Sequence, residues 1–269
     1  MNWKEIDLIP VIRTAIHAGH AIKEVYNTGF SVETKQDDSP ITVADRKSHD
    51  IIIQYLNRTG IPVMSEEGID IPYEERKAWA LYWLVDPLDG TKEFIKKNDE
   101  FTVNIALIKN QKPVMGVIYV PVLDILYFAR KELGAFRLDN ASNAITKPET
   151  LETLSGKATK LPTNDHPEVF TIVASRSHMS EETKEFIGKL EEKYGEIKMM
   201  SRGSSLKLCM VAEGKANIYP RFAPTSEWDT AAGQAIVECS GGQLTHINEI
   251  DPILYNKKDL LNPWFIAKR

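Results

Sequence analysis

The sequence predicts a layered protein of the α/β and α+β classes, built from two parts that differ in pattern. Apolar residues recur at helical spacing over residues 6–26, which indicates a long amphipathic helix. Three apolar, β-rich runs at 101–109, 114–120 and 124–129 are separated by prolines, a pattern typical of an antiparallel meander. Beyond residue 170, strand-like and helix-like runs alternate, which favours an α/β layer.

The remaining expected elements complete the two parts. In the first part they are a strand at 31–35, a polar turn at 36–40, a helix from near Thr42 through Leu56, and a strand at 61–65. In the second part strands and helices are expected in the order 170–174, 180–193, 196–200, 204–213, 216–219, 229–239 and 263–267. Residues 139–168 are polar and poor in large apolar side chains, so they are the expected linker or exposed excursion. The predicted domains are 1–160 and 161–269.

Composition excludes several classes of function. The net charge of -5 argues against a protein that coats nucleic acid by bulk electrostatics. No apolar run approaches the roughly 20 residues that span a bilayer, and the first seven residues lack the pattern of a signal peptide. Cys209 and Cys239 are expected to be buried free thiols, which fits a reducing cytoplasm. Peripheral association with the inner face of the membrane stays open, as does the choice between monomer and homodimer.

The most informative segment is Trp83–Thr91, a predicted buried strand that runs into two carboxylates. Asp86 and Asp89 lie three residues apart at the strand end, where they can bind divalent cations. The backbone N–H groups of Gly90 and Thr91 begin a predicted helix, and a helix N-terminus binds anions well. A metal site beside a phosphate site favours a metal-dependent phosphatase. The alternative is an ordinary strand-to-turn junction, which Asp, Pro and Gly also form.

Three further acids occur at the ends of predicted elements: Asp45, Glu66 and Asp229. Each has a simple alternative role, because Asp45 and Asp229 could merely cap the helices that follow them. A purely structural protein would not need five oxygen-bearing side chains gathered from across the sequence. The combination therefore favours a metal site over isolated surface acids.

With these motifs the chain resembles the lithium-sensitive, Mg²⁺-dependent phosphatase superfamily of inositol monophosphatases. The resemblance rests on Thr42–Asp45, Glu66–Glu67, Asp86–Thr91 and Trp228–Gly233, which follow one another in the superfamily's order. It implies a layered αβαβα sandwich of the inositol monophosphatase/fructose-1,6-bisphosphatase type. Ser65 is a departure, because Gly often precedes the acid pair in this superfamily.

Other segments resemble the bacterial 3'(2'),5'-bisphosphate nucleotidase branch: Leu84–Ile95, Ser175–His178, Gly203–Lys207, Val211–Ala216 and Tyr219–Phe222. This resemblance implies hydrolysis of the 3'-phosphate of 3'-phosphoadenosine 5'-phosphate (PAP) to AMP, with conversion of the 5'-phosphosulfate analogue PAPS to APS left open. An inositol or other sugar phosphatase is an alternative, since the metal motifs do not separate these substrates. A metal- and nucleotide-binding sensor without turnover is the alternative from another class.

The resemblance also implies a role for each residue of the metal site. Two to three Mg²⁺ ions are expected to be held by Glu66, Asp86, Asp89, Asp229 and the carbonyl of Leu88. Oxygen ligands without His or Cys suit Mg²⁺. Asp45 and Thr91 are expected to form a pair that orients and deprotonates the attacking water, and Glu66 is the third expected catalytic residue.

The nucleotide contacts are expected in the second part of the chain. Ser204, Lys207 and Arg221 would hold the 5'-phosphate, and His178 would lie near the adenosine. The alternative for His178 is a loop histidine or a strand-end cap, and the alternative for Arg221 is a surface ion pair. Lys35 is expected to approach the metal site. The substrate-binding set is completed by Gly90, Thr91 and Asp229.

Overall fold

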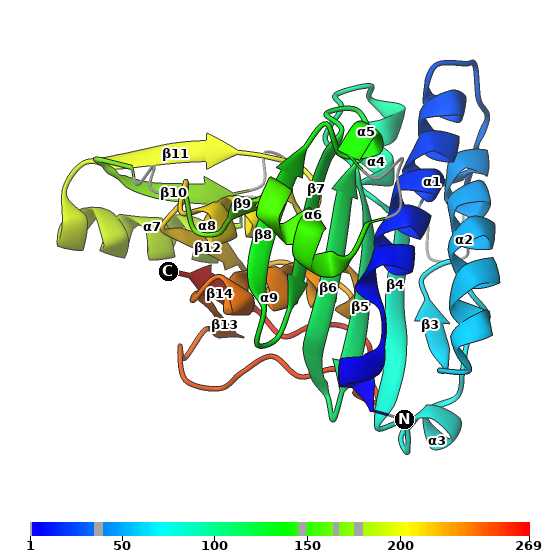
Figure 1. Cartoon of the computed structure of the whole chain (residues 1–269). Helices are drawn as coiled ribbons and strands as arrows, with labels where there is room; N and C mark the ends of the chain where they lie inside the picture. The colour runs from blue at the N-terminus through cyan, green and yellow to red at the C-terminus, as the bar shows by residue number, and fades with distance from the viewer. Residues whose placement is uncertain (1, 35–39, 145–148, 164–166, 175–179) are drawn as a thin grey trace.

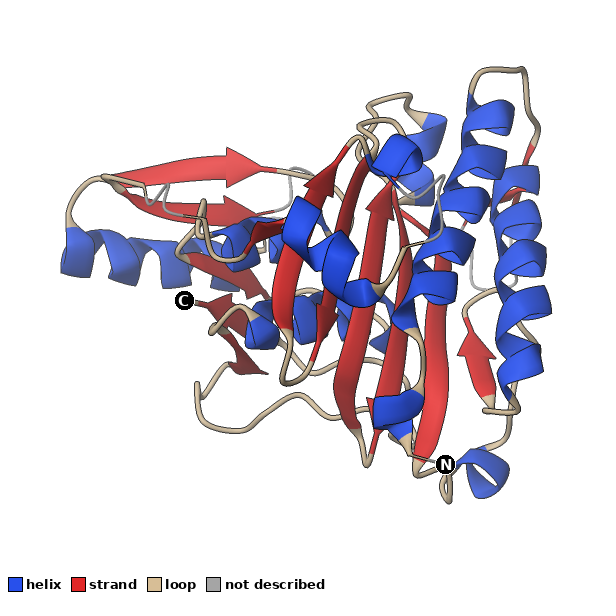
Figure 2. Ribbon diagram, in the orientation of Figure 1, coloured by secondary structure: helices blue, strands red, loops and turns tan. Residues whose placement is uncertain are grey.

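The structure, a computed structural model, describes residues 2–34, 40–144, 149–163, 167–174 and 180–269. In these ranges the strands form a seven-stranded sheet, a five-stranded sheet and a two-stranded ribbon (Figures 1 and 2). The ribbon pairs β1 (Val32–Thr34) with β2 (Pro40–Thr42). Among the described residues, none of the helices has the length and apolarity to cross a bilayer.

The seven-stranded sheet contains the predicted meander. Its order is β3-β4-β5-β6-β7-β8-β9, and only the pairing of β3 with β4 is parallel. The strands are β3 (Val63–Ser65), β4 (Leu81–Asp89), β5 (Thr102–Lys109), β6 (Lys112–Val120), β7 (Ile125–Arg130), β8 (Gly134–Asp139) and β9 (Thr159–Lys160). The meander is confirmed, and β8 and β9 extend it beyond the three predicted runs.

The expected excursion at 139–168 is wrong in part. It contains α5 (Ala141–Ala144), α6 (Leu151–Lys157) and the edge strand β9, which pairs with β8. Leu154 and Leu161 are buried and anchor this segment. Two buried leucines in a polar stretch are too few to produce a periodic pattern, so the sequence signal was that of a loop.

The five-stranded sheet follows the predicted alternation. Its order is β11-β10-β12-β14-β13. The strands are β10 (Phe170–Ala174), β11 (Ile197–Ser201), β12 (Ile218–Arg221), β13 (Gln243–His246) and β14 (Phe265–Lys268), and the helices are α7 (Glu181–Tyr194), α8 (Leu206–Glu213) and α9 (Glu227–Cys239). The predicted elements are confirmed with ends shifted by one or two residues; β13 was not predicted.

Both faces of the larger sheet are buried, which explains its uninterrupted apolar strands. On β5, Ile105 and Leu107 pack with α1 (Leu8–Tyr26) and α2 (Val43–Leu56) in one core cluster. Ala106 and Ile108 point to the other face and pack with α8 and α9 in a second cluster. The second cluster continues onto the smaller sheet, whose far face packs against α7. The layers are therefore α1/α2, sheet, α8/α9, sheet and α7, which confirms the expected αβαβα sandwich (Figure 1).

Besides α5 and α6, the described residues contain four further short helices outside these layers: η1 (Trp3–Glu5), η2 (Asn57–Thr59), α3 (Tyr73–Arg76) and α4 (Thr91–Ile95). The helix predicted to begin at Gly90–Thr91 is confirmed as α4. Cys209 is a buried free thiol as expected, whereas Cys239 is only half-buried. The division into domains 1–160 and 161–269 stays a prediction.

Candidate active site

A β-bulge brings Asp86 and Asp89 to the same side of β4. In a regular strand, residues three apart point to opposite faces. Here Asp86 pairs with Asn104 and Asp89 pairs with Thr102, so β4 contains one residue more than β5 between the two pairs. Since Asn104 and Thr102 share a face of β5, both aspartates lie on that face. The N–H of Leu88, inside the bulge, donates to Oδ1 of Asp86 at 3.1 Å.

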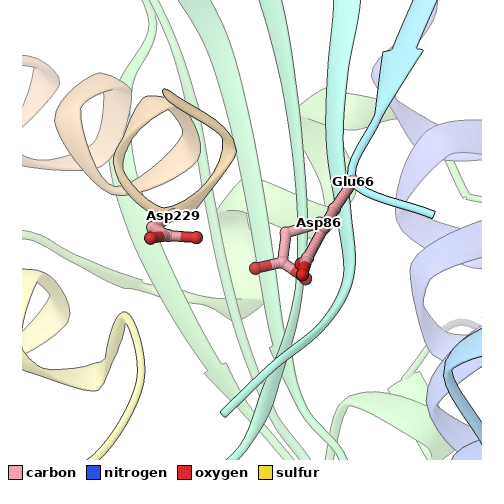
Figure 3. A group of neighbouring side chains, drawn as sticks. All are labelled: Glu66, Asp86 and Asp229. Carbon is pink, nitrogen blue, oxygen red and sulfur yellow. The ribbon is translucent and has the colours of Figure 1, made fainter. Parts of the chain in front are cut away.

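Three carboxylates from three different elements meet at this point (Figure 3). Glu66 follows β3, Asp86 lies on β4, and Asp229 lies in the first turn of α9. One oxygen of each carboxylate lies within 4.8 Å of the other two. Figure 3 shows Glu66 and Asp86 converging while Asp229 points toward them from the helix. We call these three residues the acidic group.

Asp229 both caps its helix and belongs to the acidic group. It is the third residue of α9, and its Oδ2 accepts a hydrogen bond of 2.8 Å from the N–H of Ser226, the N-cap. A capping-box carboxylate stabilises a helix start in this way. The simple capping role considered for Asp229 is therefore compatible with metal binding, because the capping contact fixes the side chain in place.

Burial and mutual repulsion raise the pKa of three aspartates at this site. Burial, reinforced by Glu66, Asp89 and Asp229, holds the pKa of Asp86 well above its usual value. Burial followed by the charge of Asp89 raises the pKa of Asp229 to about 8. Burial likewise raises the pKa of Asp89 to about 6, although Lys207 opposes the shift. A divalent cation would offset this repulsion, and the all-oxygen donor set suits a hard ion such as Mg²⁺.

Asp89 lies beside the acidic group, and its Oδ2 is already bound by protein donors. That oxygen accepts hydrogen bonds from the N–H of Ser205 at 2.6 Å and from Asn104 Nδ2 at 3.2 Å. Thr102 Oγ1 lies 3.5 Å away. These partners were not predicted, although Asn104 interrupts the apolar run 103–108 of β5, a signal that could have identified it. The metal-ligand role of Asp89 stays a prediction.

The hydroxyl of Thr91 donates to Asp45 across the gap between α4 and α2. Thr91 Oγ1 lies 3.0 Å from Asp45 Oδ1 and 3.3 Å from the carbonyl oxygen of Leu88. The other carboxylate oxygen of Asp45 accepts from the N–H and the hydroxyl of Thr42, at 2.8 and 2.6 Å. Burial raises the pKa of Asp45, while these hydrogen bonds oppose the shift. Asp45 therefore caps α2 with one oxygen and binds Thr91 with the other.

A cavity of about 140 Å³ opens beside Asp229 and Asp89. Its lining includes Lys207, the second residue of α8, whose Nζ donates to the carbonyl of Ser204 at 2.6 Å. Burial lowers the pKa of Lys207 to about 8. Buried cationic groups need partners, so this lysine suits an anionic ligand.

Two lining atoms are buried and have no hydrogen-bond partner among the described residues: Arg221 Nε and Ser204 Oγ. Arg221 Nη2 donates to the carbonyl of Pro224 at 3.0 Å, a contact that does not involve Nε. A buried donor without a partner is costly unless a ligand or water satisfies it. The structure thus brings Ser204, Lys207 and Arg221 together around one cavity, as the sequence predicted.

Glycines permit the close approach of α4 to the loop before α8. Gly90 has a φ of +93°, a conformation that favours glycine. A Cβ atom on Gly203 would lie 2.7 Å from Cγ of Glu93 and 2.9 Å from the carbonyl oxygen of Glu100. The N–H of Gly203 donates to Glu100 Oε2 at 2.8 Å. Glu93, which lines the cavity, was not predicted as a site residue.

Two predicted site residues, Lys35 and His178, lie outside the described residues, as does the segment 175–179. All other predicted residues lie in or beside the acidic group, the Asp45–Thr91 pair and the cavity.

The layered fold and its acidic group define the class of protein. Residues 5–268 match the model of the inositol monophosphatase family. The chain belongs to this family, as the resemblance predicted.

Several known proteins are similar to the chain over most of its length. The chain is 45% identical over 262 residues to the 3'(2'),5'-bisphosphate nucleotidase CysQ of Salmonella typhimurium, covering 95% of this chain and 96% of that protein. The crystal structure of CysQ from Bacteroides thetaiotaomicron superimposes with a TM-score of 0.89 at 47% identity, over 97% of this chain and 96% of the other. The extragenic suppressor protein suhB from Bartonella henselae gives a TM-score of 0.73 at 26% identity, over 97% and 92%.

Proposed function

We propose that this chain is a Mg²⁺-dependent 3'(2'),5'-bisphosphate nucleotidase that hydrolyses PAP to AMP and phosphate. The observation that carries the proposal is the position of Asp229, which belongs to the acidic group and also lines the cationic cavity. One substrate with two phosphates can therefore reach both. The nucleotidase activity named for the relatives supports the same conclusion.

The residues proposed to hold two or three Mg²⁺ ions are Glu66, Asp86, Asp89, Asp229 and Leu88, the last through its carbonyl oxygen. Bound metal would lower the pKa of water and offset charge on the transferring phosphoryl group. The support is the crowding of the carboxylates described above, which a cation would relieve. The number of ions stays a prediction.

Asp45 and Thr91 are proposed to accept the proton of the attacking water. Thr91 uses its only hydroxyl proton toward Asp45, so its lone pairs are left to accept a hydrogen bond from water. As the water oxygen forms a bond to phosphorus, its proton passes to Thr91 and the Thr91 proton passes to Asp45. The bond between phosphorus and the 3'-oxygen breaks, and the leaving oxygen takes a proton from solvent. Water attacks directly, without a phosphoenzyme.

The cavity is proposed to bind the 5'-phosphate of the nucleotide. Lys207 and Arg221 supply positive charge, and Ser204 supplies a hydroxyl. The N–H groups of Gly90 and Thr91 would face the 3'-phosphate at the acidic group. A second cationic position favours a bisphosphate over an inositol monophosphate, because a monophosphate at the acidic group would leave Lys207 and Arg221 without an anionic partner. A cytoplasmic role in clearing this by-product of sulfate assimilation follows as part of the proposal.

The test is phosphate release from PAP, inositol 1-phosphate and fructose 1,6-bisphosphate, measured side by side with Mg²⁺ and with or without Li⁺. We expect a strong preference for PAP that Li⁺ abolishes. Preference for a sugar phosphate would be consistent with the metal site but would contradict the assignment of the cavity to the 5'-phosphate. PAP binding without release of phosphate from any substrate would instead support a sensor.

A further inference from the structure

A fully buried carboxylate lies two residues before Asp229. Glu227, the first residue of α9, has no exposed surface. Its Oε2 accepts from the N–H of Asn256 at 2.7 Å, and its Oε1 accepts from the N–H and Nζ of Lys257 at 2.9 and 2.6 Å. A buried carboxylate requires such partners. All three donors come from one loop, so Glu227 ties the start of α9 to residues 256–257.

Arg76 binds the same loop from the opposite direction. It is the last residue of α3 and is only 3% exposed. Its Nη1 donates to Asn256 Oδ1 at 2.9 Å and to the carbonyl of Lys257 at 2.7 Å, while Nη2 donates to the carbonyl of Lys258 at 3.2 Å. Asn256 Nδ2 donates back to the Arg76 carbonyl at 2.7 Å. We call Arg76, Asn256, Lys257 and Glu227 the buried clamp.

The clamp joins the chain segments that carry the acidic group. Arg76 lies in the connection between Glu66 and Asp86, and Glu227 lies on the helix that carries Asp229. Like charges at the acidic group repel and act to separate these segments. A rigid polar connection between them opposes that separation and keeps the carboxylates at a distance one cation can bridge.

We infer that Glu227 and Arg76 are positioning residues for the metal site, which act through loop 256–258 to hold Asp229 against Glu66 and Asp86. The inference rests on the metal site of the proposed function. Neither residue belongs to the acidic group, and both act at a distance by fixing the elements that carry it. Residues that bond metal ligands directly typically change metal affinity about 10- to 100-fold when they are removed, and we expect an effect of this order from the clamp.

The test is calorimetric titration of Mg²⁺ into the full chain without substrate. Glu227→Gln and Arg76→Lys are expected to weaken Mg²⁺ binding about 10- to 100-fold, and saturating Mg²⁺ is expected to restore most of kcat. Glu213→Gln is the matched control, because Glu213 is also a buried carboxylate that accepts a hydrogen bond from an arginine. Glu213 is 2% exposed, and Arg137 Nη1 lies 3.0 Å from it. It is the last residue of α8, at the opposite end of that helix from Lys207. The Mg²⁺ affinity of Glu213→Gln should stay within about twofold of wild type, even if its melting temperature falls as much as those of the clamp variants.

A double-variant cycle separates the clamp from general damage. Glu227→Gln and Arg76→Lys act through the same loop, so their combined effect on Mg²⁺ affinity should be clearly less than the product of the single effects. An equal loss of Mg²⁺ affinity in Glu213→Gln, or unchanged Mg²⁺ affinity in both clamp variants, would overturn the inference. Either result would leave the assignment of the metal site intact. Absence of Mg²⁺ binding by the wild-type chain would overturn the metal site and the inference with it.

Discussion

The carboxylate of Asp45 divides its two oxygens between two segments: Oδ2 caps α2, and Oδ1 accepts the Thr91 hydroxyl at 3.0 Å. The helix cap fixes the orientation of the carboxylate, so the hydroxyl is held in one direction as well. The helix cap and the proposed role of Asp45 as a proton acceptor are therefore compatible, because they use different oxygens.

Replacement of Thr91 by Val should lower kcat by about 100- to 10,000-fold, the range typical of a lost general base. Valine keeps the shape of the side chain but cannot pass a proton to Asp45. Steady-state phosphate release at saturating Mg²⁺ measures the effect. Thr91→Ser is the control, since it retains the hydroxyl and should lose far less activity. Similar losses in both variants would remove the hydroxyl from the proposed proton path.

Asp86→Asn should abolish turnover and Mg²⁺ binding, because it removes a central charge from the acidic group. The same change should raise the melting temperature of the metal-free chain, since it relieves the repulsion from Glu66, Asp89 and Asp229. Activity assays test the predicted loss of turnover, and thermal melts in EDTA test the predicted rise in melting temperature. An unchanged kcat would contradict the metal assignment, and a lower melting temperature in EDTA would contradict the repulsion.

Arg221→Ala should raise KM for PAP about 10- to 100-fold, equivalent to the 1.5–3 kcal/mol typical of a charged hydrogen bond. The KM for a 3'-monophosphate, which lacks the 5'-phosphate, should change little. Arg130→Ala is a suitable control, because Arg130 lies on β7 away from the cavity lining. An equal rise in KM for both substrates would separate Arg221 from the 5'-phosphate.

The metal-free chain should lose stability as pH rises from about 4 to 8. The pKa values of Asp89 and Asp229 are raised to about 6 and about 8 from a usual value near 3.8. The folded state therefore holds protons that the unfolded state has released, and this contribution to the free energy of unfolding disappears as pH rises through the folded pKa values.

Mg²⁺ should reverse this trend, because the ion replaces those protons and binds more tightly at higher pH. At a concentration 100 times its Kd, binding adds about 2.7 kcal/mol to the free energy of unfolding. Thermal melts at pH 5.5 and 8.5, each with Mg²⁺ and with EDTA, measure the effect. A gain from Mg²⁺ that is larger at pH 5.5 would contradict the proposed proton exchange.

The local pattern of the sequence was sufficient to predict the meander and the alternating second part. The strand before Asp86 and the helix after Gly90 are set by periodicity and turn residues, which depend on neighbours in the chain. The acids at element ends, together with the resemblance to one family, predicted the three residues that now form the acidic group.

The tertiary structure alone decided how these pieces meet. The bulge at Pro87–Leu88 is a shift in the register between β4 and β5. The pairing of two strands determines this shift, and neither strand encodes it by itself. The burial of Lys207 depends on packing between two sheets. Glu227 was overlooked because its partners, residues 256–257, are about 30 positions away and reach it only through the fold. Contacts between distant segments follow from packing rather than periodicity, and for that reason the clamp is visible only in three dimensions.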